Sequence, residues 1–203
     1  WPGLLQRFRE AYPLVSVRLV AFQQGEPLPD AVAEGVLDVA VTLCAGECPS
    51  SDFQSVTLCQ VPLMAAMGEA HPLAGRAAVT PAELARERLL VPQARGSVGF
   101  PALMTELFHS CRVSPAITYT GERMEEALLR VQLDDQVALI PRCYFPDIPQ
   151  AGLHAAQVSG TTGLFRLTAL ARGNSTNPAV SLFLRLCRAE VKRQRMEQLS
   201  SPE

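Results

Sequence analysis

The spacing of apolar residues changes as soon as the chain passes its first helix. Four apolar residues at helical spacing predict a helix over residues 4–12, which Pro13 ends. Alternating apolar and polar residues over 15–22 then predict a strand. The chain therefore opens with a helix that leads directly into a strand.

Short apolar runs and helical patterns alternate along the rest of the sequence. Gly35 is the expected left-handed cap of a helix over 28–34, and the apolar run 36–43 predicts a strand covered on both faces. Pro62 indicates a break within the apolar stretch 53–67. The later predicted strands are 88–93, 116–120, 136–140, 153–159 and 164–172, and the later helices are 100–111, 122–132 and a long C-terminal one.

Two helix starts carry capping signals. Thr80 and Glu83 have the spacing of a capping box, with Pro81 at the first helical position. Asn177 followed by Pro178 gives the same kind of start to the C-terminal helix. Strands alternating with helices indicate an α/β fold with mainly parallel sheets. The strands are too many for one sheet of a 203-residue chain, so we expect two small Rossmann-like lobes with a cleft between them.

The composition excludes several classes of protein. Charged residues make up 19% of the chain and the net charge is −2, which gives neither a disorder signature nor a basic field for nucleic acid. No apolar run is long enough for a membrane span, and the first residues lack the order of a secretory signal. The basic residues near the C-terminus are interrupted by Glu190 and Glu197, which favours a solvated helix face over contact with DNA.

Six cysteines are present, and three of them lie in apolar stretches. We expect reduced thiols in a cytoplasmic protein. Cys44 and Cys48 are close enough to chelate a metal ion or to form a redox-sensing disulfide, but no second Cys/His pair has ligand spacing. We expect neither a metal nor a cofactor.

Four stretches in this order resemble the effector-binding domain of LysR-type transcriptional regulators. They are "LLQRFREAYPLVSVRLV", "LPDAVAEGVLDVAVTL", "HPLAGRAAVTPAELARERLLV" and "MEEALLRVQLDDQVALIP". The resemblance covers about residues 2–190 and implies a fold like that of type 2 periplasmic binding proteins. It implies a regulatory lobe I formed by residues 1–68 and 146–203, a lobe II formed by 69–145, and a small effector held between them.

The sequence departs from the family pattern in two places. In the family, a central strand of lobe I precedes the opening helix, and a DNA-binding domain precedes that strand. Because this sequence starts at the helix, the first strand of lobe I is apparently missing, and we expect another element in its place or a distorted lobe. Residues 133–136 also replace the family's glycine-rich "GxG", so that loop is expected to have a different shape.

Carboxyl ends of strands and amino ends of helices favour anionic ligands in such folds. Arg95 and Ser97 are the strongest candidates to bind a carboxylate, because arginine offers a bidentate fork and serine a neutral donor. The alternative interpretation of 93–99 is a solvated turn. The predicted effector-binding residues are Gln23, Gln24, Thr42, Arg95, Gly96, Ser97, Val98, Gly121 and Glu122.

Nothing in the sequence favours an enzyme. Dinucleotide, phosphate-loop and nucleophile-elbow motifs are absent, and the three histidines are scattered. The prediction is therefore a ligand-sensing domain without catalysis, which reaches DNA only through a domain outside this sequence. The alternative is a solute-binding protein of a transport system with the same fold. The resemblance also implies a homodimer through lobe I, with Leu5, Phe8, Arg9, Arg18 and Val20 at the interface.

Overall fold

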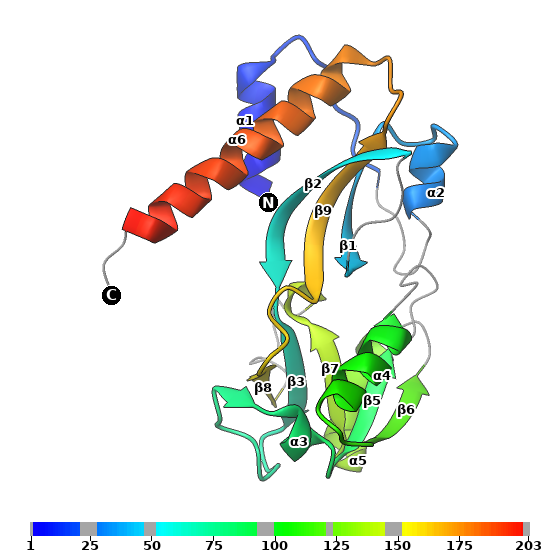
Figure 1. Cartoon of the computed structure of the whole chain (residues 1–203), viewed down its shortest axis with the longest axis vertical. Helices are drawn as coiled ribbons and strands as arrows, with labels where there is room; N and C mark the ends of the chain where they lie inside the picture. Colours follow the sequence, from blue (N-terminus) through cyan, green and yellow to red (C-terminus); the bar gives the residue numbers. More distant parts are fainter. Residues whose placement is uncertain are drawn as a thin grey trace. The chain divides into compact units, whose positions relative to one another are not determined.

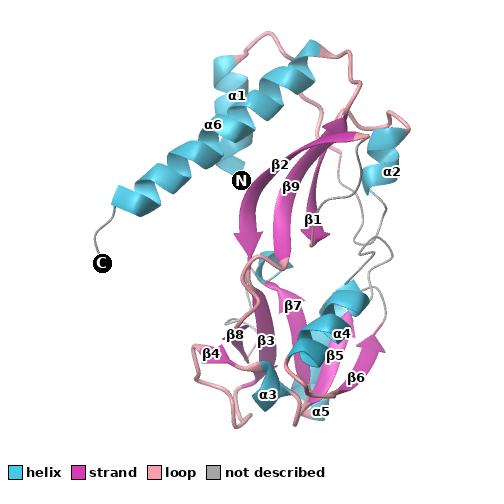
Figure 2. Ribbon diagram, viewed as in Figure 1, coloured by secondary structure: helices cyan, strands magenta, loops and turns pink. Residues whose placement is uncertain are grey.

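The computed structural model describes residues 2–20, 28–46, 52–92, 100–120, 124–144 and 152–200. The described chain divides into two compact units, which are treated separately below. Unit 1 comprises the described residues up to Cys59 and those from Arg166 onward, and unit 2 comprises the described residues of Gln60–Phe165. Each unit has its own sheet, coloured magenta in Figure 2, with three strands in unit 1 and six in unit 2.

The sheet of unit 2 has the order β4-β8-β3-β7-β5-β6. Its strands are β3 (Leu63–Gly68), β4 (Ala78–Val79), β5 (Arg88–Pro92), β6 (Ala116–Thr120), β7 (Val137–Pro141) and β8 (Leu153–Val158). Strand β5 is parallel to both β6 and β7, whereas β3 is antiparallel to both β7 and β8. Strand β4 is also parallel to β8, so three of the five pairs are parallel: the sheet is mixed, and the prediction of mainly parallel pairing holds for most of it.

Three helices and one turn of 3-10 helix complete unit 2. They are α3 (Pro81–Leu84), α4 (Phe100–Ser110), α5 (Met124–Asp134) and η1 (Arg142–Tyr144). Helix α5 places Ala127 and Val131 against Leu90, Ala138 and Ile140 of the sheet, all of them buried. Strand β7 is buried at every position and β5 at every position after Arg88, so both faces of these strands are covered.

The predicted capping box at the start of α3 is confirmed. The Thr80 hydroxyl accepts a hydrogen bond from the Glu83 N–H at 3.3 Å, and the Glu83 carboxylate accepts one from the Thr80 N–H at 2.8 Å. The hydrogen bond from the Thr80 backbone, and after it the one from Arg76, lower the pKa of Glu83 to about 2. The backbone N–H groups of Thr80 and Glu83 at the start of this short helix are therefore both hydrogen-bonded by nearby side chains.

Unit 1 packs helices against a smaller sheet of order β1-β9-β2 (Figure 1). Its elements are α1 (Pro2–Ala11), α2 (Leu28–Ala33), β1 (Val39–Ala45), β2 (Phe53–Val61), β9 (Phe165–Arg172) and α6 (Pro178–Ser200). The arrows in Figure 1 show that β9 runs opposite to β1 and β2. The core joins α1 to α6 through Leu4, Phe8, Val180, Phe183 and Leu184, which pack against β2 and β9.

The helix boundaries in unit 1 follow the predicted signals. Gly35 has φ +79° after α2, as its predicted role in ending that helix requires. The Asn177 side chain accepts a hydrogen bond from the Ala179 N–H at 3.0 Å and so caps α6. Val180, Phe183, Leu184 and Cys187 form the buried face of α6, which confirms the helical spacing of these apolar residues.

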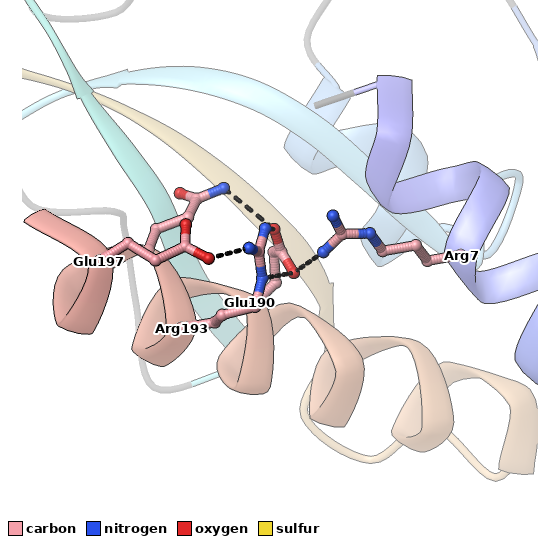
Figure 3. A network of polar contacts seen from close by, with 5 residues as sticks. Arg7, Glu190, Arg193 and Glu197 are labelled. Carbon is pink, nitrogen blue, oxygen red and sulfur yellow. Dashed lines mark hydrogen bonds and ion pairs between the residues drawn. The ribbon is translucent and has the colours of Figure 1, made fainter.

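An ion-pair network links α1 to the outer side of α6 (Figure 3). Glu190 pairs with Arg7 of α1 and, at 2.6 Å, with Arg193 of its own helix, and Arg193 also pairs with Glu197. The hydrogen bond from Arg193 is the main cause that lowers the pKa of Glu190 to about 2, and the charge of Arg7 contributes. One carboxylate therefore holds guanidinium groups from two helices.

The strand predicted over 15–22 does not form within the described part of it. Residues 15–20 do not form a strand, and residues 21 and 22 lie outside the described residues. Strand β1 ends the sheet beside β9, so the described residues offer 15–20 no paired neighbour. A strand requires hydrogen-bonded neighbours for its backbone groups, and local alternation of side chains cannot supply them.

The bounds of the two units differ from those that the resemblance implied. The implied lobe II, residues 69–145, leaves β3 and β8 in lobe I, but both strands pair within the sheet of unit 2. The structural division instead falls at 59/60 and 165/166. The order along the chain is the implied one, with both ends in one unit and the middle in the other.

Candidate functional site

Two neighbouring strands of unit 2 end directly before the sequence segments that carry predicted binding residues. Strands β5 and β6 are parallel, and their register pairs Pro92 with Thr120 at their carboxyl ends. Helix α4 begins at Phe100 after the first segment, and α5 begins at Met124 after the second. Carboxyl ends of parallel strands and amino ends of the following helices together favour polar or anionic ligands.

Most of the predicted binding residues belong to segments outside the described residues. This holds for Gln23 and Gln24 in 21–27, for Gly121 and Glu122 in 121–123, and for four residues in 93–99, namely Arg95, Gly96, Ser97 and Val98. Their role stays a prediction. Thr42 is described: it lies within β1 of unit 1 and is half-buried.

Thr120 is a candidate that sequence analysis missed. It is the last residue of β6, its side chain is 5% exposed, and its hydroxyl has no hydrogen-bond partner among the described residues. A buried hydroxyl without a partner is costly, by about 1–3 kcal/mol, unless a bound molecule satisfies it. The available signal was the position of a threonine at the end of a strand, directly before the predicted "GE" loop.

Unit 1 contains a separate cavity of about 460 Å³, which we call the strand groove. It is lined by residues 15–20 and by Val39, Ala40 and Val41 of β1. Apolar side chains of α1 and α6, among them Leu5, Phe8 and Phe183, also line it. The groove contains few charged groups, so it is suited to apolar contact and to hydrogen bonds with backbone.

The residues predicted for a dimer interface occupy different environments in unit 1. Arg9, Arg18 and Val20 are exposed, and Leu5 is half-buried beside the core. Phe8, in contrast, is 3% exposed, with its ring 5.2 Å from that of Phe183 in an edge-to-face contact. The structure therefore contradicts the prediction for Phe8, because its ring packs in its own core and is not presented to a partner.

The described residues contain no group of three or more His, Cys, Asp or Glu side chains that could hold a metal ion. His71 is buried, accepts a hydrogen bond from the Leu73 N–H at its Nδ1 atom, and places Nε2 3.4 Å from Glu87, which is a structural arrangement. Burial raises the pKa of the Cys187 thiol to about 11. None of the described helices is long and apolar enough to cross a membrane.

The structure has two α/β units, and the carboxyl ends of β5 and β6 are suited to an anionic ligand. These features are typical of the class of two-lobed ligand-binding domains. The profile of the LysR substrate binding domain matches residues 1–192, and the chain belongs to this family. The chain is 29% identical over 141 residues to the HTH-type transcriptional regulator TtuA of Agrobacterium vitis. These aligned residues make up 70% of this chain and 46% of that protein. The chain thus spans about half the length of that relative.

Solved structures support the same fold. The effector binding domain of QuiR in complex with shikimate has a TM-score of 0.76 at 18% identity, covering 95% of this chain and 90% of that one. The regulatory domain of Synechocystis CcmR in complex with 2-PG has a TM-score of 0.70 at 19% identity, covering 94% and 90%. At these identities the likeness shows the fold alone.

Proposed function

We propose that this chain senses a small effector molecule for a transcriptional regulator and has no catalytic activity of its own. The observation that carries the proposal is the carboxyl edge of β5 and β6, where the buried Thr120 hydroxyl has no hydrogen-bond partner among the described residues and two polar stretches of sequence follow the strands. Family membership and the named relatives, which are regulators, support it. Binding would bias a conformational equilibrium that a DNA-binding domain outside this sequence reads, in the cytoplasm.

The proposed effector is a small carboxylate or an aromatic acid. Arg95 would bind its anionic group, and Ser97 with the neighbouring backbone N–H groups would donate further hydrogen bonds. The Thr120 hydroxyl would donate to, or accept from, a polar atom of the same molecule, which removes the cost of leaving it unsatisfied. Gln23, Gln24, Thr42, Gly96, Val98, Gly121 and Glu122 complete the proposed set.

A ligand screen tests this proposal. Thermal shift against small carboxylates and aromatic acids, shikimate included, should reveal a binder, since a ligand at 100 times its Kd stabilises by about 2.7 kcal/mol. The affinity of the binder is then measured by calorimetry. Absence of any binder in a broad library would contradict the proposal.

Two threonine variants locate the site. Thr120→Val keeps the shape of the side chain, so it should leave stability unchanged or raise it while weakening the effector about tenfold. Thr168→Val is the matched control, because Thr168 is also buried and its hydroxyl also lacks a hydrogen-bond partner among the described residues, but it lies in β9 of unit 1. Equal effects of both variants on affinity would remove Thr120 from the site. Arg95→Ala should also weaken an anionic effector about tenfold.

We also propose that the chain forms a two-fold homodimer through unit 1. The exposed residues Arg9, Arg18 and Val20, with the half-buried Leu5, supply the proposed surface. Val20 is 48% exposed and Leu19 beside it 70%, which is an apolar edge that a second copy would cover. Sedimentation velocity should show a dimer that Val20→Asp converts to monomer, and a monomeric unsubstituted chain would contradict this.

A further inference from the structure

Four exposed cations follow one face of the C-terminal helix α6. They stand at steps of three, four and three residues, which is the spacing of a single helix face, and we call them the basic stripe: Arg185, Arg188, Lys192 and Arg195. Arg185 donates a hydrogen bond to the neutral Tyr12 hydroxyl at 3.2 Å, and the other three form no hydrogen bond or ion pair with any described residue. The charge of the stripe is therefore not neutralised by the part of the chain that the structure describes.

The two glutamates of α6 do not interrupt the stripe. In the sequence, Glu190 and Glu197 stand among the cations, each two residues from a member of the stripe. Residues two apart in a helix point about 200° away from each other, so both carboxylates lie on the opposite side of α6. There they pair with Arg7 and Arg193 (Figure 3). Two carboxylates and two guanidinium groups cancel, so this network leaves the charge of the stripe as it is.

The stripe continues onto a part of α6 that does not contribute to the core. Val191 is the last described residue of α6 that packs against the core of unit 1, and residues 192–197 are all exposed. The helix nevertheless continues to Ser200. The ion pairs of Arg193 with Glu190 and Glu197, at steps of three and four residues, stabilise such an extension. A helix that carries unneutralised cations beyond its own core is suited to contact with a large anionic partner.

From this arrangement we propose that the basic stripe binds the phosphate backbone of double-stranded DNA without regard to base sequence. This partner rests on the proposed function, in which a DNA-binding domain outside this sequence holds the chain close to DNA. At about 1.5 Å of helix per residue the stripe is about 15 Å long, and a DNA strand carries one phosphate per about 3.4 Å of axis, so the stripe faces about four phosphates.

The chemistry of the stripe determines how strong this contact is. Guanidinium and ammonium groups bind phosphate oxygens through charge-assisted hydrogen bonds. The net charge of the chain is −2, so the rest of the surface adds no attraction and the contact is confined to the stripe. The affinity of the isolated chain is therefore low, and the contact gains strength when DNA is held nearby, because the effective concentration is then high.

Fluorescence anisotropy of a labelled duplex of about 20 base pairs tests the proposal. At low salt the chain should bind this duplex. The logarithm of the affinity should fall against the logarithm of the salt concentration with a slope of about −3 to −4, since each neutralised phosphate contributes about −0.9. No binding at low salt, or an affinity that does not depend on salt, would overturn the proposal.

Two triple variants with the same change of charge locate the contact. The test variant replaces three stripe residues: Arg188→Gln, Lys192→Gln and Arg195→Gln. It should weaken DNA at least tenfold and make the salt slope shallower by about 0.9 for each charge removed. Glutamine has nearly the helix propensity of lysine and arginine, so α6 should persist in this variant, which circular dichroism checks.

The control variant replaces three exposed arginines that belong to separate segments of unit 2: Arg86→Gln, Arg112→Gln and Arg142→Gln. It should leave the affinity for DNA within about twofold of the unsubstituted chain, because these charges form no common row. Equal losses from the two variants would assign the binding to net charge and overturn the proposal.

Amide NMR signals of the unsubstituted chain identify the surface without any substitution. Addition of the duplex should shift the signals of residues 185–195 and leave those of α5 in place. Shifts confined to other segments would contradict the proposal. Poly-glutamate of matched charge is the second probe: if it binds as tightly as the duplex, the stripe is a surface for an acidic polypeptide and the proposal is overturned.

The outcomes for this proposal and for the proposed function can be told apart. The DNA measurements are made without effector, and the thermal-shift screen is made without DNA. The stripe variant should bind the effector with unchanged affinity, because its substitutions lie in unit 1 and the proposed effector site at the edge of β5 and β6 lies in unit 2. Loss of effector binding in this variant would overturn the assignment of the stripe to DNA alone.

Discussion

The two units are built from similar helices and strands, but they differ in how completely those strands are paired. In unit 2, β3, β5, β7 and β8 each have a hydrogen-bonded neighbour on both sides, and β7 is buried at every position. In unit 1, β9 alone lies between two strands, and residues 15–20 have the pattern of a strand without its pairing. The comparison shows that alternating apolar and polar residues determine which side chains face the core. A strand also requires a neighbouring strand that hydrogen-bonds its backbone.

The completeness of unit 2 makes it the more sensitive to truncation of a core side chain. Leu90 is fully buried in β5 and contacts the core beneath α5. Leu90→Ala should lower the free energy of unfolding by about 2–5 kcal/mol, because it removes buried methyl groups and leaves a cavity. Urea denaturation followed by circular dichroism measures the change.

Leu90→Met is the control for that substitution. It nearly conserves the volume of the side chain and should cost less than about 1.5 kcal/mol. If Leu90→Ala proves as mild as Leu90→Met, the core of unit 2 is not as tightly packed as its burial indicates.

The next largest effect is expected where β9 and β2 of unit 1 meet. The Gly173 N–H donates to the Asp52 carbonyl oxygen at 2.7 Å, and a Cβ atom on Gly173 would lie 2.9 Å from that oxygen. Gly173→Ala must therefore displace backbone, and should lower the free energy of unfolding by about 1–3 kcal/mol. Thermal unfolding measures it.

Gly3→Ala is the matched control, since nothing lies within 4 Å of a Cβ atom there and alanine favours the helix α1. It should be neutral or slightly stabilising. A comparable loss from both substitutions would point to a general effect of the added methyl group and not to the close approach of Gly173 to Asp52.

The smallest expected effect is the pH dependence of the link between α1 and α6. The pKa of Glu190 is lowered to about 2 in the folded chain, from an ordinary value of 4.5. Its contribution to stability is therefore complete above pH 4.5 and is lost as the pH falls toward 2. Glu190→Gln should lower the Tm at pH 7 and flatten the decline in Tm between pH 4.5 and 2.

Glu10→Gln is a suitable comparison for Glu190→Gln, because Glu10 is exposed on α1 and hydrogen-bonds only Gln6 within the described residues. It should leave the pH profile as it is. Identical pH profiles for the Glu190→Gln variant and the unsubstituted chain would show that the network contributes nothing measurable, as many surface ion pairs do.

Local signals in the sequence predicted the elements of both units well wherever their cause is local. The Thr80 capping box, the Asn177 cap, the left-handed Gly35 and the break at Pro62 all depend on a few neighbouring residues, and the structure has each of them. Strand direction and the division into units depend on pairing between distant segments, so local patterns do not determine them: three pairs in the sheet of unit 2 are parallel and two are antiparallel. The mixed sheet of unit 2 depends on β3 pairing with β8, about 90 residues later in the chain.

The candidate site shows the same limit. The sequence correctly indicated the strands β5 and β6 and the helices α4 and α5, because apolar runs and helical spacing are visible without a structure. It could not identify Thr120, which is a candidate because it is buried and has no hydrogen-bond partner in the described part of the chain, and both properties come from the surrounding fold. Phe8 was assigned to a surface for a similar reason, since helical spacing does not say which element covers an apolar face.

The buried thiol on α6 has a practical consequence for studying unit 1. Burial raises the pKa of the Cys187 thiol to about 11, which disfavours the reactive thiolate at pH 7, and the side chain lies in the core. Alkylating reagents therefore modify this residue only when the long helix detaches from the strands beneath it. The rate at which Cys187 is modified can be measured by mass spectrometry of the peptide that contains it. This rate reports how often unit 1 opens, without any introduced label.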